Sequence, residues 1–328
     1  MREERDRQRA MSTAPQTYTP APVIATAARD ISLLAADLRP CLRGAVKLDE
    51  PMSNHTTFRI GGPADLFVQP LDADDLAAVT RFAPQKGLPA KVIGNGSNLL
   101  VSDGGIRGLV VRLAPAFREV RWLEDGVEAG AGVALQRLVK ESVGAGLSGL
   151  ESTVGIPGTL GGALATNAGT DTGSIGDLVE KAVVLDARGE LSEWTHAQCA
   201  YRYRYSNLRA AGITVVSARL KLQPATPEGI RAKIERLRAK RAARQPLGAW
   251  SAGSVFKNPR GVAAGKVLDR AGAKGMRQGE AEVSRSHANF FINRGRASAA
   301  QVMALIERTH ALALRRYGID LELEIELV

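Results

Sequence analysis

Two glycine-rich stretches of this sequence could bind phosphate groups through their backbone amides. The run GIPGTLGGALATNAG at 155–169 contains five glycines, and the shorter run GNGSN occupies 94–98. Glycine has no Cβ, so a phosphate can closely approach the backbone N–H groups of such a loop. Neither run has the spacing of a Walker loop or of a G-x-G-x-x-G motif, and each alone is also compatible with an ordinary turn.

The two loops together indicate a larger ligand than either loop alone. They lie in consecutive α/β units, which suggests one ligand with two phosphates held between the units. A dinucleotide cofactor bound without the Rossmann fingerprint points to a different kind of FAD-binding fold. The residues that we expect to contact this cofactor are Gly94, Asn95, Gly96, Ser97, Asn98, Gly155, Ile156, Pro157, Gly158, Gly161, Gly162, Asn167, Ala168 and Gly169.

Other segments carry reactive or charged side chains that the local sequence leaves ambiguous. An arginine guanidinium can bind a carboxylate through two parallel hydrogen bonds. Three neighbouring arginines are equally good candidates for binding a carboxylate ligand: Arg202, Arg204 and Arg209. Near residue 328, three glutamates share one face of an alternating segment, or form a solvent-facing strand edge: Glu322, Glu324 and Glu326. Ser254, in the run GSVFKNP, is locally typical of a turn.

The elements that must position these groups form an α/β (α+β) chain. Hydrophobic periodicity predicts helices at 29–38, 72–86 and 135–145, and strands at 90–93, 99–101, 109–111, 182–186 and 213–222. A basic helix at 228–244 follows Pro224 and Pro227. Ser298 and Gln301 predict a capping box for a last helix that ends at Gly318, and a strand is predicted at 321–328.

Composition bounds the class of protein. The 328 residues are 45% hydrophobic and 24% charged, as in soluble globular chains, and no apolar run approaches a membrane span. Cys41 and Cys199 lack metal-ligand spacing, so we expect reduced thiols, no metal and a cytoplasmic protein. The net charge of +10 favours anionic partners, but the helix at 228–244 has no aromatic residue, which disfavours nucleic-acid binding.

Seven motifs occur in an order that resembles the UDP-N-acetylenolpyruvoylglucosamine reductases, also called UDP-N-acetylmuramate dehydrogenases. The resemblance covers about 48–328 and rests on NHTTFRIGGPAD (54–65), VIGNGSNLLVSDGG (92–105), LESTVGIPGTLGGALATNAG (150–169), YRYRYSNL (201–208), GSVFKNP (253–259), SHANFFIN (286–293) and GIDLELEIEL (318–327).

This resemblance implies a fold and a reaction. Two α/β subdomains would bind FAD non-covalently in the manner of the vanillyl-alcohol-oxidase type, and a C-terminal α+β domain would bind the substrate. The implied division is an N-terminal extension at 1–28, FAD-binding subdomains at 29–113 and 114–224, and a substrate domain at 225–328. NADPH would reduce FAD, and UDP-N-acetylglucosamine enolpyruvate would be reduced to UDP-N-acetylmuramate for peptidoglycan precursor synthesis, by a monomer.

The resemblance also assigns roles to individual residues. Ser254 matches the family's proton donor, Arg204 the arginine that holds the substrate carboxylate, and Glu324 the glutamate of the C-terminal L-E-x-E motif. Lys257 and Asn258 would reach the sugar nucleotide or its pyrophosphate, with a hydrogen-bonded turn as the alternative. A carboxylate at Glu324 would repel the substrate carboxylate, so Glu324 is expected to be protonated or screened by Arg204.

The sequence departs from the family pattern at two points. Thr170–Gly173 replaces the frequent Ala-Tyr-Gly, which puts flavin contacts by that tyrosine in doubt. No tyrosine lies between Val215 and Pro246, so the chain resembles the shorter type without a clamping tyrosine loop, and Arg241 and Arg244 are candidates to close the site. His55 could suggest a covalent flavin anchor, but the family implies a structural role.

Two other functions compete with the reductase. The same fold could serve an oxidase or dehydrogenase with another acceptor, although GSVFKNP and the C-terminal glutamates belong to the substrate domain. A non-enzymatic nucleic-acid binder would explain the charge but lacks an accompanying motif. The sequence does not decide between Met1 and Met11 as the start, or between NADPH and NADH.

Overall fold

The computed structural model describes residues 30–113 and 117–328, so the predicted extension at 1–28 lies outside the described residues. The helices are α2 (Ile31–Leu38), α3 (Ala73–Gln85), α4 (Leu135–Ala145), α5 (Leu160–Thr166), α6 (His196–Cys199), α7 (Asn207–Ala210), α8 (Pro227–Ala242), α9 (Ala264–Arg270) and α10 (Ala299–Tyr317). The strands are β1 (Ala45–Pro51), β2 (Pro63–Gln69), β3 (Ala90–Ile93), β4 (Leu99–Leu100), β5 (Ile106–Arg112), β6 (Val120–Leu123), β7 (Gly126–Gly130), β8 (Leu147–Ser148), β9 (Gly169–Thr170), β10 (Gly173–Ser174), β11 (Val179–Leu185), β12 (Leu191–Thr195), β13 (Thr214–Lys221), β14 (Gln223–Pro224), β15 (Arg277–Gln278), β16 (Ala281–Val283), β17 (Phe291–Asn293) and β18 (Glu326–Leu327).

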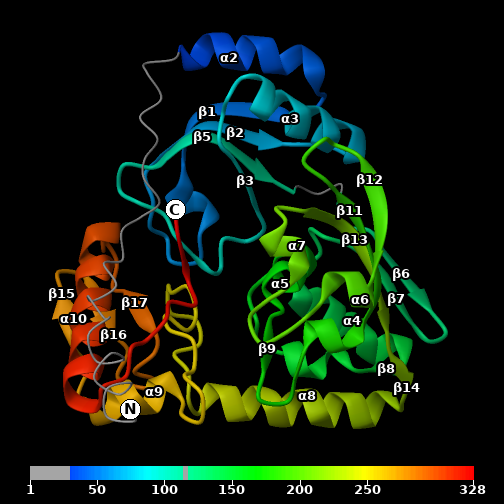
Figure 1. Cartoon of the computed structure of the whole chain (residues 1–328). Helices are drawn as coiled ribbons and strands as arrows, with labels where there is room; N and C mark the ends of the chain where they lie inside the picture. The colour runs from blue at the N-terminus through cyan, green and yellow to red at the C-terminus, as the bar shows by residue number, and fades with distance from the viewer. Residues whose placement is uncertain (1–29, 114–116) are drawn as a thin grey trace, which may run out of the picture.

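Two sheets form the larger part of the molecule (Figure 1). The first has the order β1-β2-β5-β3, with β5 parallel to both β2 and β3. The second is antiparallel and has the order β12-β11-β13-β7-β6. One hydrophobic core joins them, since it contains Leu66 and Leu109 from the first sheet and Val127 and Leu220 from the second. The two α/β units therefore pack as one body around a shared interior.

The third part of the chain has a core of its own. β15, β16 and β17 form a small antiparallel sheet against which α10 packs, and Phe256, Phe291 and Leu305 lie buried in this second core. The predicted capping box of α10 is present, with Ser298 and Gln301 exchanging bonds between side chain and backbone, and Gly318 ends the helix with φ of 64°. Phe58 and Ile60 also join this core and so connect it to the first unit.

The C-terminal segment is not the continuous strand that the sequence predicted. Only β18 is paired as a strand, parallel to β4, with Glu326 opposite Leu99. The preceding residues bond to the GSVFKNP loop instead, through Glu324 N–H to Val255 O at 2.8 Å and Lys257 N–H to Glu322 O at 2.8 Å. The four apolar residues of this segment still face the second core, with Leu321 and Ile325 buried and Leu323 and Leu327 packed against it, but only Glu322 of the three glutamates is exposed.

Local patterns predicted several elements to within a residue or two. α4 and β3 have the predicted bounds, and α2 begins one residue after its N-cap, Asp30. The basic helix is α8, which runs beneath the second unit toward the third part (Figure 1). No helix among the described residues is both long enough and apolar enough to cross a membrane.

Candidate active site

A cavity of about 2610 Å³ gathers nearly all the predicted site residues. Ligand sites for drug-sized molecules usually measure roughly 300–1,000 Å³, so this cavity has room for two large ligands. It is lined by Arg204, Ser254, Lys257, Asn258, Glu324 and every predicted cofactor residue except Gly161. Gly161 instead packs on α5 against Ala131, where an added Cβ would lie 2.8 Å from the Ala131 Cβ. Its glycine therefore serves packing between elements and does not line the cavity.

The two glycine-rich loops lie side by side on the cavity wall. Asn95 Nδ2 donates to Pro157 O at 3.1 Å, and a Cβ on Gly158 would lie 3.5 Å from Ser97 Oγ. Within the described residues, the backbone N–H groups from Asn95 to Asn98 donate no hydrogen bond. Free amides on a wide cavity wall fit the phosphates of a dinucleotide cofactor, so the residues present fit FAD.

Gly96 is needed for the conformation of the first loop. Its φ is +59°, and an added Cβ would lie 2.1 Å from His55 O. The side chain of His55 is buried, bridges Glu50 and Arg112 at 2.8 and 3.0 Å, and stacks on Phe67. Burial lowers the pKa of His55. These contacts support the structural role that we expect for His55.

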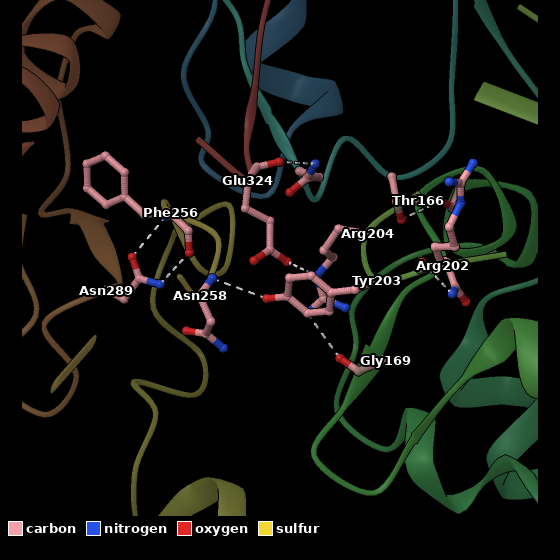
Figure 2. Close-up of polar contacts among 12 residues, drawn as sticks. Thr166, Gly169, Arg202, Tyr203, Arg204, Phe256, Asn258, Asn289 and Glu324 are labelled. Carbon is pink, nitrogen blue, oxygen red and sulfur yellow. Dashed lines mark hydrogen bonds and ion pairs between the residues drawn. The ribbon is translucent and has the colours of Figure 1, made fainter. Parts of the chain in front are cut away.

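Arg204 and Glu324 meet across the cavity (Figure 2). Arg204 Nε donates to Glu324 Oε1, and Arg204 Nη2 donates to Gly169 O at 3.2 Å. Arg204 has a φ of +53°, a conformation that is costly for a residue with a Cβ and is typical of functional sites. Burial raises the pKa of Glu324, while the charge and hydrogen bond of Arg204 oppose that shift.

The structure distinguishes the three C-terminal glutamates and the three arginines by their partners. Glu322 is exposed and pairs with Lys257, whereas Glu326 pairs with Lys91 and Arg209. Glu324 alone pairs with Arg204, and its side chain is 16% exposed compared with 67% for Glu322. The third arginine, Arg202, lies 4.4 Å from the centre of the Tyr205 ring. Only the pair Arg204 and Glu324 combines burial, opposite charge and access to the cavity.

The loop that carries Ser254 is held by a residue to which the sequence assigned no role. Asn289 is buried, accepts from Phe256 N–H at 2.9 Å and donates to Phe256 O at 2.8 Å (Figure 2). Ser254 forms a β-bridge with Phe290, and within the described residues its hydroxyl has no hydrogen bond. The hydroxyl is therefore free to act on a ligand in the cavity.

Tyr203 is a second residue that sequence reasoning missed. The residue is 57% exposed, and its hydroxyl accepts a hydrogen bond from Asn258 N–H at 3.2 Å, joining the second unit to the GSVFKNP loop (Figure 2). Its place in the motif YRYRYSNL was the available signal, but the contact spans 55 positions of sequence. Asn258 uses its side-chain oxygen to accept from Ala264 N–H at 3.0 Å.

The remaining candidates lie at the edge of the site. Arg241 Nη1 donates to Val154 O at 2.8 Å, beside Gly155, and burial lowers the pKa of Arg241. Arg244 lines the cavity, and its side chain makes no hydrogen bond or ion pair with the described residues. The described residues contain no group of three or more His, Cys, Asp or Glu side chains arranged to hold a metal ion.

Comparisons with known proteins agree with this architecture. A sequence model described as an FAD binding domain matches residues 64–195, and one described as the C-terminal domain of UDP-N-acetylenolpyruvoylglucosamine reductase matches 245–328. The reductase of Moorella thermoacetica is 48% identical over 91% of this chain and 98% of its own length. That of Geobacter metallireducens is 45% identical over 90% of this chain and 98% of its own length.

A solved structure of such a reductase is also similar to this chain. The crystal structure of the reductase from Thermus caldophilus has a TM-score of 0.75 and 36% identity, and the match covers 87% of this chain and 99% of that chain. The fold and the site thus define an FAD-binding flavoprotein with an added C-terminal α+β domain, as expected. The chain belongs to the UDP-N-acetylenolpyruvoylglucosamine reductase family.

Proposed function

We propose that this protein is the NADPH-dependent, FAD-containing reductase that converts UDP-N-acetylglucosamine enolpyruvate to UDP-N-acetylmuramate in peptidoglycan precursor synthesis. The observation that carries the proposal is the pairing of Arg204 with Glu324 in a cavity that also contains Ser254 and both glycine-rich loops. FAD, when bound, accepts a hydride from NADPH and delivers it to the enolpyruvyl double bond. The loops at 94–98 and 155–158 would hold its phosphates through their amides.

Arg204 is the residue suited to the substrate carboxylate. A guanidinium binds a carboxylate in a bidentate manner and stabilises the enolate-like charge that develops when hydride adds to the neighbouring carbon. In the described structure this guanidinium is engaged by Glu324. The substrate would therefore exchange one carboxylate partner of Arg204 for another, so binding need not expose an unpaired buried charge.

Glu324 suits this exchange because its pKa is raised by burial. A glutamate that keeps its proton does not repel the incoming carboxylate and can donate a hydrogen bond to it. Once the substrate carboxylate pairs with Arg204, the attraction between Arg204 and Glu324 weakens, and this attraction is one of the causes that lower the pKa of Glu324. We infer that Glu324 acts in its protonated form, as a polarising partner of the substrate carboxyl group.

Ser254 is the proposed proton donor. A serine hydroxyl is a weak acid, but a carbon that carries enolate-like charge is a strong enough base to take its proton. The absence of an internal hydrogen bond on this hydroxyl within the described chain leaves it free for that transfer. Lys257 and Asn258, on the same loop, would contact the sugar nucleotide or its pyrophosphate.

A pair of anaerobic stopped-flow measurements tests the function. NADPH should bleach the flavin absorbance, and mixing the reduced enzyme with UDP-N-acetylglucosamine enolpyruvate should restore it rapidly. Colour that returns only with oxygen would identify an oxidase instead, and a protein that cannot be loaded with FAD would refute the flavoenzyme. We expect the protein to be cytoplasmic and monomeric. The sedimentation coefficient of the FAD-loaded protein would test the monomeric state.

A further inference from the structure

The basic helix α8 presents one face to the active-site cavity. Arg231, Ile234, Arg238 and Arg241 follow at spacings of three and four residues, which places them on one side of the helix. All four line the cavity, and Glu235 lies beside them. Arg236, on another side of the same helix, does not line it. As far as Arg238, the charges of α8 are therefore divided between a cavity face and an outer face, while in the last turn both Lys240 and Arg241 line the cavity.

Two arginines of this face have side chains without a hydrogen-bond or ion-pair partner among the described residues. Lys233 pairs with Glu151, Lys240 with Asp171, and Arg241 donates to Val154 O and Gln245. The side chains of Arg231 and Arg238 are exposed to the cavity and form no hydrogen bond or ion pair with residues 30–113 or 117–328. The neighbouring carboxylate of Glu235 lies outside ion-pair distance of both and reduces their net charge only partly.

The position of this arginine pair separates it from the reacting groups. Seven residues of helix place Arg231 and Arg238 about 10 Å apart along the axis, and Arg231 lies about 15 Å before Arg241, the residue that contacts the glycine-rich loop. The N-terminal half of α8 packs on the second unit, against α4 and the segment 147–153 (Figure 1). Ser254 and Glu324 lie in the third part of the molecule, because the next residue after each, Val255 and Ile325, is buried in its core.

We propose that Arg231 and Arg238 bind the 2′-phosphate of NADPH and so make the enzyme prefer NADPH to NADH. This inference rests on the proposed function and deepens it. The 2′-phosphate is the group by which the two dinucleotides differ, and it lies on the adenosine, at the end opposite the nicotinamide. A dianionic phosphate is the ligand that two unpaired guanidinium groups bind best. We expect the phosphates of the sugar nucleotide nearer its reacting end, on the part of the cavity wall that Lys257 and Arg244 line.

The test measures flavin reduction alone, in the FAD-loaded enzyme, with NADPH and with NADH. Arg231→Ala and Arg238→Ala should each lower the rate constant divided by Kd for NADPH by about tenfold, and the double variant by about a hundredfold, while NADH is unaffected. Arg236→Ala removes the same charge from the same helix, and it should change the rate constant divided by Kd neither for NADPH nor for NADH. Arg238→Lys should retain part of the preference, since an ammonium supplies charge without the planar fork.

A binding measurement provides a readout that does not depend on turnover. Adenosine 2′,5′-bisphosphate should bind the FAD-loaded parent enzyme more tightly than AMP in calorimetry, and the double variant should lose this difference. Equal losses for NADPH and NADH, or unchanged rates for both, would overturn the proposal. So would a loss confined to the KM of the enolpyruvyl substrate, which would assign the arginines to the sugar nucleotide.

The two proposals can fail separately. If the enzyme does not reduce the enolpyruvyl substrate but the double variant still loses its preference for NADPH, the inference about α8 stands and the proposed function falls. The flavin content and melting temperature of each variant check that it is folded. The side chain of neither arginine makes a hydrogen bond or ion pair within the described chain that its removal would break.

Discussion

Ser254 lies on a loop whose shape does not depend on its hydroxyl. Asn289 holds Phe256, and Val255 bonds to the C-terminal segment, while the Ser254 hydroxyl has no partner among the described residues. We predict that Ser254→Ala leaves flavin reduction by NADPH unchanged and slows reoxidation by the enolpyruvyl substrate by roughly 10²–10⁴-fold. Stopped-flow absorbance separates the two steps. Equal slowing of both would remove Ser254 from the role of proton donor.

Glu324 provides a second test at the scale of one residue. Burial raises its pKa, so it keeps its proton at a pH where an exposed glutamate has lost it. If the protonated form is active, the rate of substrate reduction falls as pH rises through that raised pKa. Glu324→Gln is neutral at every pH, and we predict that it is slower but lacks this fall. A pH profile that keeps the same fall in Glu324→Gln would show that another group titrates.

At the scale of elements, the loop at 94–98 depends on one glycine. Gly96→Ala would place a Cβ against His55 O at a residue with a positive φ. We predict a loss of bound FAD and a destabilisation of more than about 1 kcal/mol. Gly144→Ala is the matched control, because Gly144 lies within α4 and an added Cβ would have no atom within 4 Å.

The control should move in the opposite direction. Alanine is favoured over glycine within a helix by roughly 0.5–1 kcal/mol, so Gly144→Ala should retain FAD and melt at a slightly higher temperature. Flavin absorbance per mole of protein and the denaturation midpoint measure both effects. Normal flavin content in Gly96→Ala would show that the loop tolerates another conformation.

At the scale of the whole molecule, the two glycine-rich loops come from units that share one core, while the third part has a separate core. FAD should therefore stabilise the shared body directly. At a free FAD concentration of a thousand times Kd, binding would add about 4 kcal/mol to the free energy of unfolding. We predict that removing FAD lowers the first calorimetric transition by several degrees and that adding it back restores the transition. An unchanged melting profile would contradict this.

The sequence predicted best what depends on neighbours in the chain. The helix at 135–145, the strand at 90–93 and the capping box at Ser298 follow from local periodicity and local hydrogen bonds. Local spacing did not separate Glu324 from Glu322 and Glu326, because their difference arises from partners far away in sequence. The bonds of Asn289 and Tyr203 to the GSVFKNP loop were missed for the same reason.

The predicted strand at 321–328 shows a related limit. Alternation fixes which side chains face inward, but it does not supply a neighbouring strand, and the segment bonds to a loop over most of its length. Gly161 was grouped with its loop because glycines look alike in sequence, and only packing against Ala131 distinguishes it. The division of the chain at 113 and 224 is our proposal, which limited proteolysis would test.

The pairing of Arg204 with Glu324 has a consequence for the choice of inhibitors. An acidic compound that binds Arg204 must compete with the carboxylate of Glu324. Glu324 binds Arg204 more tightly as pH rises and it loses its proton, so the competition increases. The potency of acidic inhibitors should therefore decline toward alkaline pH, whereas uncharged compounds that leave the pair intact should keep theirs. Screening one compound library at two pH values would sort its hits by whether they displace Glu324.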